Sequence, residues 1–215
     1  MSEVVTKPQE DNGFTPTPLK PAVSVKARKH ANHDSPAFNE GFRLLALNVR
    51  RLLGEIGPWT LVVLSARPGE GRSTTAASLA AALARLAPPV VLIDADPDGS
   101  GVSAVAAGWH DSEEVRGGKP RLQVVNPWHA SGTPEAFLDS VQEAIQDALD
   151  SGAKVIVDAP ACSGSSAGFY LATSADGVLY VTRPNASKDG GMHGEVRAQL
   201  DLLRARVLGV VVNEG

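Results

Sequence analysis

Hydrophobic runs alternate with amphipathic segments along the chain from residue 35 onward. The runs are short, rich in Val, Ile and Leu, and bounded by Gly, Pro or Asp, which is the pattern of strands buried on both faces of a sheet. They cover residues 61–64, 90–93, 122–125, 154–158, 178–181 and 208–212. The amphipathic segments predict helices over residues 35–53, 73–86, 134–150 and 187–204. This alternation predicts an α/β fold with a mainly parallel sheet flanked by helices.

The first predicted helix carries one apolar stripe, with residues at three- and four-residue steps. The stripe consists of Phe38, Phe42, Leu45, Val49, Leu52 and Leu53. Glu40 and Arg43 lie three positions apart on the same helix, so their side chains can form an ion pair. This pattern predicts a helix that packs one face on the sheet.

Two segments lack this periodicity. Residues 1–34 contain Pro, Lys, Thr, Ser and Asn with hardly any apolar clustering, and they predict a disordered arm ahead of one domain over residues 35–215. Residues 97–121 are rich in Gly and charged residues, and they predict a loop with one short helix around residues 102–107.

The composition narrows the class of protein. A net charge of −4 argues against broad electrostatic binding to nucleic acid. The single cysteine, Cys162, excludes an intrachain disulfide framework and suits a reducing cytosol. No apolar run reaches the roughly 18 residues of a membrane span. We therefore expect a cytoplasmic protein that reaches the inner face of the membrane only through a partner.

The stretch LVVLSARPGEGRSTTAASLAAAL, residues 61–83, joins a strand to a helix through a glycine turn. Such a turn directs backbone N–H groups and the positive end of the helix dipole at an anion. Residues 66–73 match the phosphate-loop template G-x-x-x-x-G-K-[ST], with Ala66 replacing the first Gly and Arg72 the Lys. We predict that the loop binds nucleotide phosphates through Pro68, Gly69, Glu70, Gly71, Arg72, Ser73 and Thr74. The alternative is a strand–helix turn that binds no ligand.

Acidic residues follow two of the predicted strands. Asp94 and Asp96 follow the strand at residues 90–93, and Asp158 ends the strand at residues 154–158. The carboxyl ends of parallel strands form the ligand crevice of an open α/β sheet. We therefore predict that Arg72, Asp94 and Asp96 are catalytic, whereas a helix cap and a turn are the alternative for the two acids.

The same reasoning gives a metal site and a base contact. Ser73, Asp96 and Asp158 offer the hard oxygen ligands that Mg²⁺ prefers, so we predict ATP and Mg²⁺ as cofactors. Asn213, at the end of the last strand, is assigned either to the adenine edge or to a simple turn. For Cys162 we expect an incidental thiol and not a nucleophile.

These motifs together resemble one family. SARPGEGRSTTAASLA, VVLIDAD, KVIVDAP, ADGVLYVTRP and VLGVVVN occur in that order, as in the deviant-P-loop ATPases, and the sequence most resembles the bacterial tyrosine kinases of capsule and exopolysaccharide synthesis. The family's E-x-x-R-x-x-R oligomerisation motif aligns with residues 40–46, and its following Asn with Asn48. The resemblance spans residues 35–213.

The resemblance implies a role for each matching residue. Asp94 and Asp96 would form the second acidic motif that helps to activate a tyrosine hydroxyl, and Asp158 would be the Walker B residue. Glu40 and Arg43 would lie at the interface of a homo-oligomer. The family also implies a membrane-embedded chain-length regulator as partner, with no nucleic acid expected.

The sequence departs from the family at three motifs. Arg72 replaces the phosphate-loop lysine, and Ala46 replaces the third arginine of the interface motif. The C-terminal tyrosine cluster is missing, and the two tyrosines, Tyr170 and Tyr180, are expected in apolar surroundings. Arg67 lies where partition ATPases carry a signature lysine, and it is either a residue acting across a dimer or a solvated arginine.

Three functions remain open. The first is a tyrosine-kinase-like ATPase of exopolysaccharide export. The second is a scaffold or regulator of the same family with weak or no catalysis. The third is a partition-type ATPase. Phosphoryl transfer depends on the exact placement of charge, so Arg72 is expected to retain binding and to lower turnover.

Overall fold

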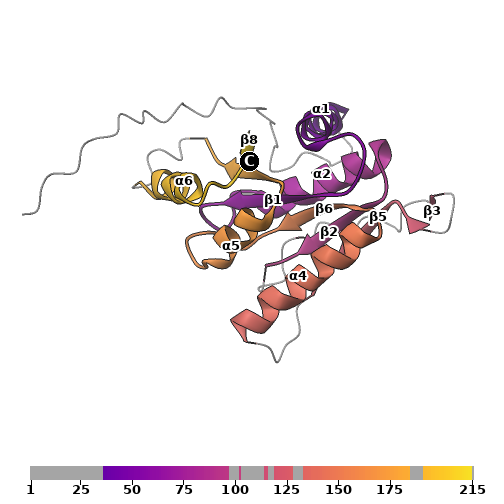
Figure 1. The fold of residues 1–215 in the computed structure, drawn as a ribbon. Coiled ribbons are helices and arrows are strands. Elements are labelled where there is room, and N and C mark those ends of the chain that lie inside the picture. The colour runs from indigo at the N-terminus through magenta and orange to yellow at the C-terminus, as the bar shows by residue number, and fades with distance from the viewer. Residues whose placement is uncertain are drawn as a thin grey trace, which may run out of the picture.

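A computed structural model describes residues 36–96, 102, 114–115, 119–127, 133–184 and 191–214. Its centre is a six-stranded sheet in the order β5-β2-β6-β1-β7-β8, with every neighbouring pair parallel (Figure 1). The strands are β1 Trp59–Ser65, β2 Val90–Asp94, β5 Leu122–Val125, β6 Lys154–Asp158, β7 Gly177–Thr182 and β8 Val207–Val212. The predicted fold class is confirmed.

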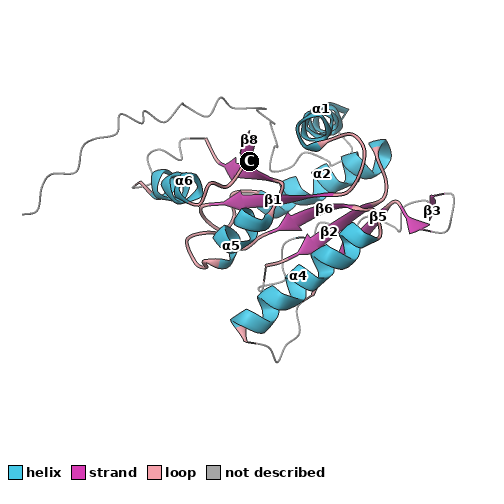
Figure 2. Cartoon of the chain, in the orientation of Figure 1, coloured by secondary structure: helices cyan, strands magenta, loops and turns pink. Residues whose placement is uncertain are grey.

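Five helices in the described part of the chain cover the two faces of this sheet (Figure 2). They are α1 Pro36–Leu53, α2 Arg72–Leu86, α4 Pro134–Asp150, α5 Ala167–Ser174 and α6 Met192–Leu202. Two short strands, β3 Glu114–Val115 and β4 Lys119–Pro120, pair as a separate antiparallel ribbon. They lie inside the segment that we expected to be a loop.

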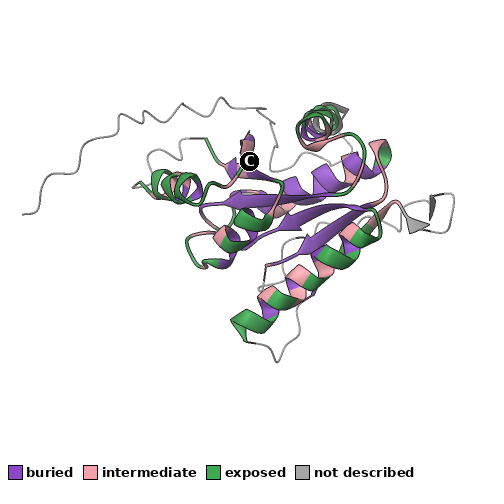
Figure 3. Ribbon diagram, viewed as in Figure 1, coloured by how far each residue is buried: buried purple, intermediate pink, exposed green. Residues whose placement is uncertain are grey.

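Alternate residues of each central strand enter two separate cores, because successive side chains of a strand point to opposite faces. In β1, Leu61 and Val63 pack with α1 and α2, whereas Val62 and Leu64 pack with α4, α5 and α6. Both faces of β1, β2 and β6 are therefore covered, and every residue of these strands is buried (Figure 3). This explains why their sequences are continuous apolar runs.

Several predicted boundaries agree closely with the structure. β5 and β6 match the predicted ranges, and α4 begins at Pro134 after the N-cap Thr133, whose hydroxyl accepts from the Ala136 N–H at 3.2 Å. The predicted last helix over residues 187–204 is shorter in the structure, and residues 185–190 lie outside the described part. The predicted helix around residues 102–107 also lies outside it, apart from Val102.

Two expectations about side chains and one about an element were wrong. Leu52 belongs to the predicted stripe of α1, yet it is exposed, whereas the next residue, Leu53, is partly buried against the core. Tyr170 is 52% exposed on α5, not in apolar surroundings. The helix α5 was missed because its eight residues include Gly168, a poor helix former. A Cβ at Gly168 would lie 2.8 Å from the Pro160 carbonyl oxygen, so close packing excludes larger residues there.

Candidate nucleotide site

The phosphate loop runs from the end of β1 to the start of α2 and is held by its own residues. The Arg67 N–H donates to Glu70 Oε2 at 2.9 Å, and the Ser65 hydroxyl donates to the Arg67 carbonyl at 3.0 Å. Gly69 and Gly71 have φ values of 78° and 91°, in the left-handed region that glycine adopts without strain. The sequence therefore builds a tight turn at the carboxyl end of the central strand.

The end of α2 beside this turn is suited to an anion. Gly71 is the N-cap residue and has no side chain to accept the first N–H groups of the helix. These groups and the positive end of the helix dipole favour a negatively charged ligand. Around Gly69, an added Cβ would meet nothing within 4 Å, so the loop is open at that point.

Three aspartates lie next to α2. Asp94 and Asp158 end the neighbouring strands β2 and β6 and are paired across them, which brings both carboxylates to the same edge of the sheet. Both residues are fully buried. Asp96 lies two residues past Asp94 and is partly exposed, and its N–H donates to Asp94 Oδ1 at 3.2 Å. The structure thus brings together the acids that the sequence predicted.

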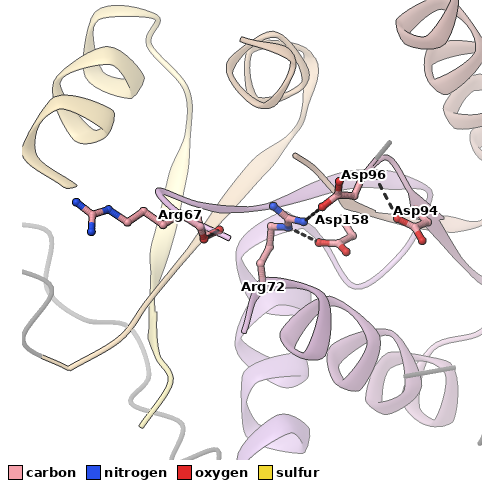
Figure 4. Close-up of polar contacts among 6 residues, drawn as sticks. Arg67, Arg72, Asp94, Asp96 and Asp158 are labelled. Atoms are coloured by element: carbon pink, nitrogen blue, oxygen red, sulfur yellow. Dashed lines mark hydrogen bonds and ion pairs between the residues drawn. The ribbon is translucent and has the colours of Figure 1, made fainter. Parts of the chain in front are cut away.

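The guanidinium of Arg72 contacts two of these acids (Figure 4). Its Nε donates to Asp158 Oδ1 at 2.7 Å, and one terminal nitrogen donates to Asp96 Oδ2. Only 7% of the Arg72 side chain is exposed. Removing one partner from a buried ion pair typically costs about 3–5 kcal/mol, so this arrangement is firmly held.

The protonation states follow from burial and from this contact. Burial raises the pKa of Asp158 to about 6, although Arg72 and a hydrogen bond from Ser73 both act to lower it. For Arg72, burial acts to lower the pKa, but the carboxylates of Asp158 and Asp96 outweigh it and raise the pKa above its ordinary value. Arg72 is therefore always charged, and Asp158 titrates near neutral pH.

The donor set has the chemistry that Mg²⁺ requires, since Ser73, Asp96 and Asp158 supply only oxygen. Within the residues that the structure describes, the buried Oδ2 of Asp158 has no hydrogen-bond partner. However, Arg72 binds Asp96 and the other oxygen of Asp158, and no three His, Cys, Asp or Glu side chains in the described ranges are arranged to hold a metal. In this arrangement the site therefore fits the guanidinium and not a divalent ion.

The side chain of Asn213 lies under the phosphate loop. Its Nδ2 donates to the Glu70 carbonyl at 3.0 Å, and the same amide leaves no room for a Cβ at Gly71. This contact ties the end of β8 to the loop between β1 and α2. The adenine contact assigned to Asn213 stays a prediction.

The remaining predicted residues lie apart from the acids. Arg67 points away from Arg72 and the aspartates (Figure 4). Glu40 and Arg43 pair with each other on the exposed surface of α1, at 2.8 and 3.0 Å. Cys162 is partly buried, and burial raises the pKa of its thiol to about 11.

One polar network beside the loop was not predicted from the sequence. Glu70 Oε1 lies 3.3 Å from His193 Nε2, and His193 Nδ1 lies 2.7 Å from the Tyr180 hydroxyl. Burial, with a contribution from Glu70, raises the pKa of Tyr180. Only the alternation of side chains along β7 indicated which face Tyr180 occupies, and nothing indicated that α6 would bring His193 to it. The network links the phosphate loop to α6.

Comparison with known proteins agrees with this geometry. The model of the CbiA family, described as the CobQ/CobB/MinD/ParA nucleotide binding domain, matches residues 61–214. The chain belongs to this family of nucleotide-binding domains, and its parallel sheet with a glycine turn at the carboxyl end of β1 is the corresponding P-loop fold.

Individual relatives align with part of the chain. Tyrosine-protein kinase CpsD of Streptococcus agalactiae is 28% identical over 174 residues, covering 72% of this chain and 74% of that protein. Maintenance of carboxysome distribution protein A of Gloeobacter kilaueensis is 33% identical over 127 residues, covering 59% of this chain and 50% of that protein. The chain is thus homologous to a bacterial tyrosine kinase and, over a shorter stretch, to a distribution protein.

Two solved structures share the fold. The chimerical protein CapA2B2 matches with a TM-score of 0.71 at 19% identity, covering 92% of this chain and 95% of that chain. The kinase domain of Escherichia coli tyrosine kinase ETK matches with a TM-score of 0.66 at 21% identity, covering 85% of this chain and 78% of that chain.

No helix in the described residues has both the length and the apolar character needed to cross a membrane.

Proposed function

We propose that this chain is a cytoplasmic, ATP-binding tyrosine-kinase-like ATPase of capsule or exopolysaccharide synthesis and export. The observation that supports it most directly is the open glycine turn at the start of α2, placed beside three aspartates from neighbouring strands. The turn offers N–H groups to phosphates, and the aspartates are the groups able to accept a proton from an incoming hydroxyl. The homology to CpsD supports the kinase-like assignment.

The proposed catalytic residues are Arg72, Asp94 and Asp96. Asp94 is buried next to Asp158, whereas Asp96 is the more exposed acid and lies nearer to solvent, where a substrate hydroxyl can reach it. Arg72 would stabilise the phosphoryl group only after its guanidinium leaves the acids. Because that step breaks a buried ion pair, we propose that turnover is slow.

A second candidate function follows from the same contact. With Arg72 held by Asp96 and Asp158, the chain would bind nucleotide without transferring phosphate, and it would act as a scaffold or regulator of polysaccharide export. In both versions we propose a membrane-embedded chain-length regulator as the partner, because the bacterial tyrosine kinases that the sequence resembles have one.

The test is a matched pair of glycine variants. Gly69 and Gly152 both have positive φ, and an added Cβ at either position would meet nothing within 4 Å, so alanine imposes similar backbone strain at both. Gly69→Ala is expected to weaken binding of a fluorescent ATP analogue by about tenfold or more, and Gly152→Ala, on the loop after α4, is expected to leave it unchanged. Equal effects at the two sites would remove the loop from the binding site.

Radiolabelled ATP separates the two candidate functions. Transfer of the γ-phosphate to a tyrosine-containing substrate supports the kinase, whereas binding without turnover supports the scaffold. A partition-type ATPase remains the third candidate because of the similarity to the carboxysome distribution protein. ATP-dependent co-sedimentation with DNA would favour it.

The oligomer that we propose uses the outer face of α1. Glu40 and Arg43 are exposed there, next to Leu44 and Leu47, which are apolar yet exposed by 47% and 36%. Leu44→Ser is expected to lower the sedimentation coefficient. Leu202→Ser removes an apolar side chain that is 75% exposed on α6 and serves as the control.

A further inference from the structure

The guanidinium of Arg72 lies between carboxylates from two different strands. Its Nε contacts Asp158 at the end of β6, and a terminal nitrogen contacts Asp96, just past β2. Arg72 itself comes from the first turn of α2, so one side chain joins three elements at the carboxyl edge of the sheet (Figure 4). The side chain is 7% exposed, so little water reaches these contacts.

Such a group of acids requires a cation. Asp94 and Asp158 are fully buried and are neighbours across β2 and β6, and buried carboxylates are tolerated only when a positive charge or several donors compensate them. Ser73 contributes a hydrogen bond to Asp158, and Arg72 contributes the charge. Arg72 thus supplies a positive charge from within the chain to two of the three aspartates, Asp158 and Asp96.

We propose that Arg72 is a built-in counter-ion of the acidic cluster, and that this site binds a nucleoside diphosphate or triphosphate without a divalent cation. The inference rests on the proposed nucleotide site and concerns only its dependence on metal. The phosphates would be held by the N–H groups of the glycine turn and of the α2 N-terminus, where Gly71 provides no capping side chain and the space around Gly69 is open.

The geometry of arginine explains why lysine would behave differently. A guanidinium has donors that diverge in a plane, so its Nε and a terminal nitrogen reach two carboxylates at once. A lysine ammonium is a compact charge on a flexible stem and has no such fork. With lysine at residue 72, the acids would lose this fixed bridge. Asp96 and Asp158 would then have oxygens available for Mg²⁺, which needs near-octahedral oxygen coordination.

The experiment measures binding with and without metal. Fluorescence anisotropy of mant-ATP is recorded with the full chain in excess MgCl₂ and in excess EDTA. For the wild-type chain, Kd is expected to differ by less than about threefold between the two conditions. For Arg72→Lys, EDTA is expected to weaken binding by about tenfold or more. Arg85→Lys changes an exposed arginine in the last turn of the same helix, so it is expected to follow the wild type.

A tenfold loss of wild-type affinity in EDTA would overturn the proposal. The same holds if Arg72→Lys is as insensitive to EDTA as the wild type, since metal independence would then have another cause. Circular dichroism and thermal melting establish that each variant is folded, and the wild-type comparison stands without any variant.

Absence of mant-ATP binding in both conditions refutes the proposed function instead. The counter-ion is then tested without nucleotide, by the electron paramagnetic resonance of free Mn²⁺ titrated with protein. Arg72→Lys is expected to bind Mn²⁺ about tenfold more tightly than the wild type. Equal affinities would overturn the assignment of Arg72 as the counter-ion.

Discussion

Replacing Gly71 with alanine tests whether the last strand holds the phosphate loop in place. Gly71 has a φ of 91°, and a Cβ at this position would lie 1.9 Å from Nδ2 and 2.8 Å from Cγ of Asn213. Real atoms do not approach so closely, so the Asn213 amide must move. When it moves, it loses its hydrogen bond to the Glu70 carbonyl.

The expected cost has two parts. Left-handed backbone in a residue with a Cβ costs about 1–2 kcal/mol. Loss of a buried hydrogen bond with an unsatisfied partner costs about 1–3 kcal/mol. Alanine also restricts the conformations of the unfolded chain, which raises the free energy of unfolding by about 0.4–1 kcal/mol. Gly71→Ala is therefore expected to lower the free energy of unfolding by about 1–5 kcal/mol.

A double-mutant cycle with Asn213→Ala, measured by urea unfolding, isolates the contact. With alanine at residue 213 the clash is relieved, so the second substitution should cost only the backbone strain. The coupling energy is then at least about 1 kcal/mol. Gly152→Ala, which has a φ of 84° and open space around its Cβ, reports the strain alone, at about 1 kcal/mol. Additive costs for Gly71→Ala and Asn213→Ala would refute the reasoning.

Three further predictions concern charge and reactivity. Arg72→Lys is expected to raise any turnover of ATP, because a lysine does not bridge Asp96 and Asp158 as the guanidinium does. An unchanged rate and an unchanged affinity for ATP would show that this bridge does not limit turnover. Burial raises the pKa of Asp158 from 3.8 to about 6, so the folded chain binds more protons than the unfolded chain between these values, and stability falls as the pH rises from about 4 to about 6. The difference in unfolding free energy between wild type and Asp158→Asn should fall over that range, and a flat difference contradicts the assignment. Burial raises the pKa of Cys162 from 9.0 to about 11, so at pH 8 its alkylation should be about 100-fold slower than in urea, and comparable rates would show an accessible thiolate.

The sequence predicted the strands and their carboxyl ends well, because the strands are buried on both faces and carry continuous apolar runs. Once β2 and β6 are known to be parallel neighbours, Asp94 and Asp158 must lie at the same edge. The glycine turn could be predicted equally well, because the positive φ at residues 69 and 71 favours glycine over every other residue type. These features depend on local pattern and on topology.

The direction of long side chains was not predictable in the same way. The motif assigns residue 72 to the phosphates, but the position of a guanidinium depends on which partners lie within its reach, and two acids from other strands compete for it. Likewise, the approach of His193 to Tyr180 and Glu70 depends on where α6 packs. The exposure of Tyr170 depends on which face of the missed helix α5 meets the sheet.

The hydrogen bond from Asn213 to Glu70 also orders events during synthesis. The strand β1 is made before its neighbours in the sheet, β6 and β7, and its loop is braced by the residue that follows β8. A nascent chain on the ribosome therefore carries an unbraced loop until residue 213 has emerged from the exit tunnel. A polypeptide truncated before that residue would therefore fold, if at all, without this brace on the loop between β1 and α2.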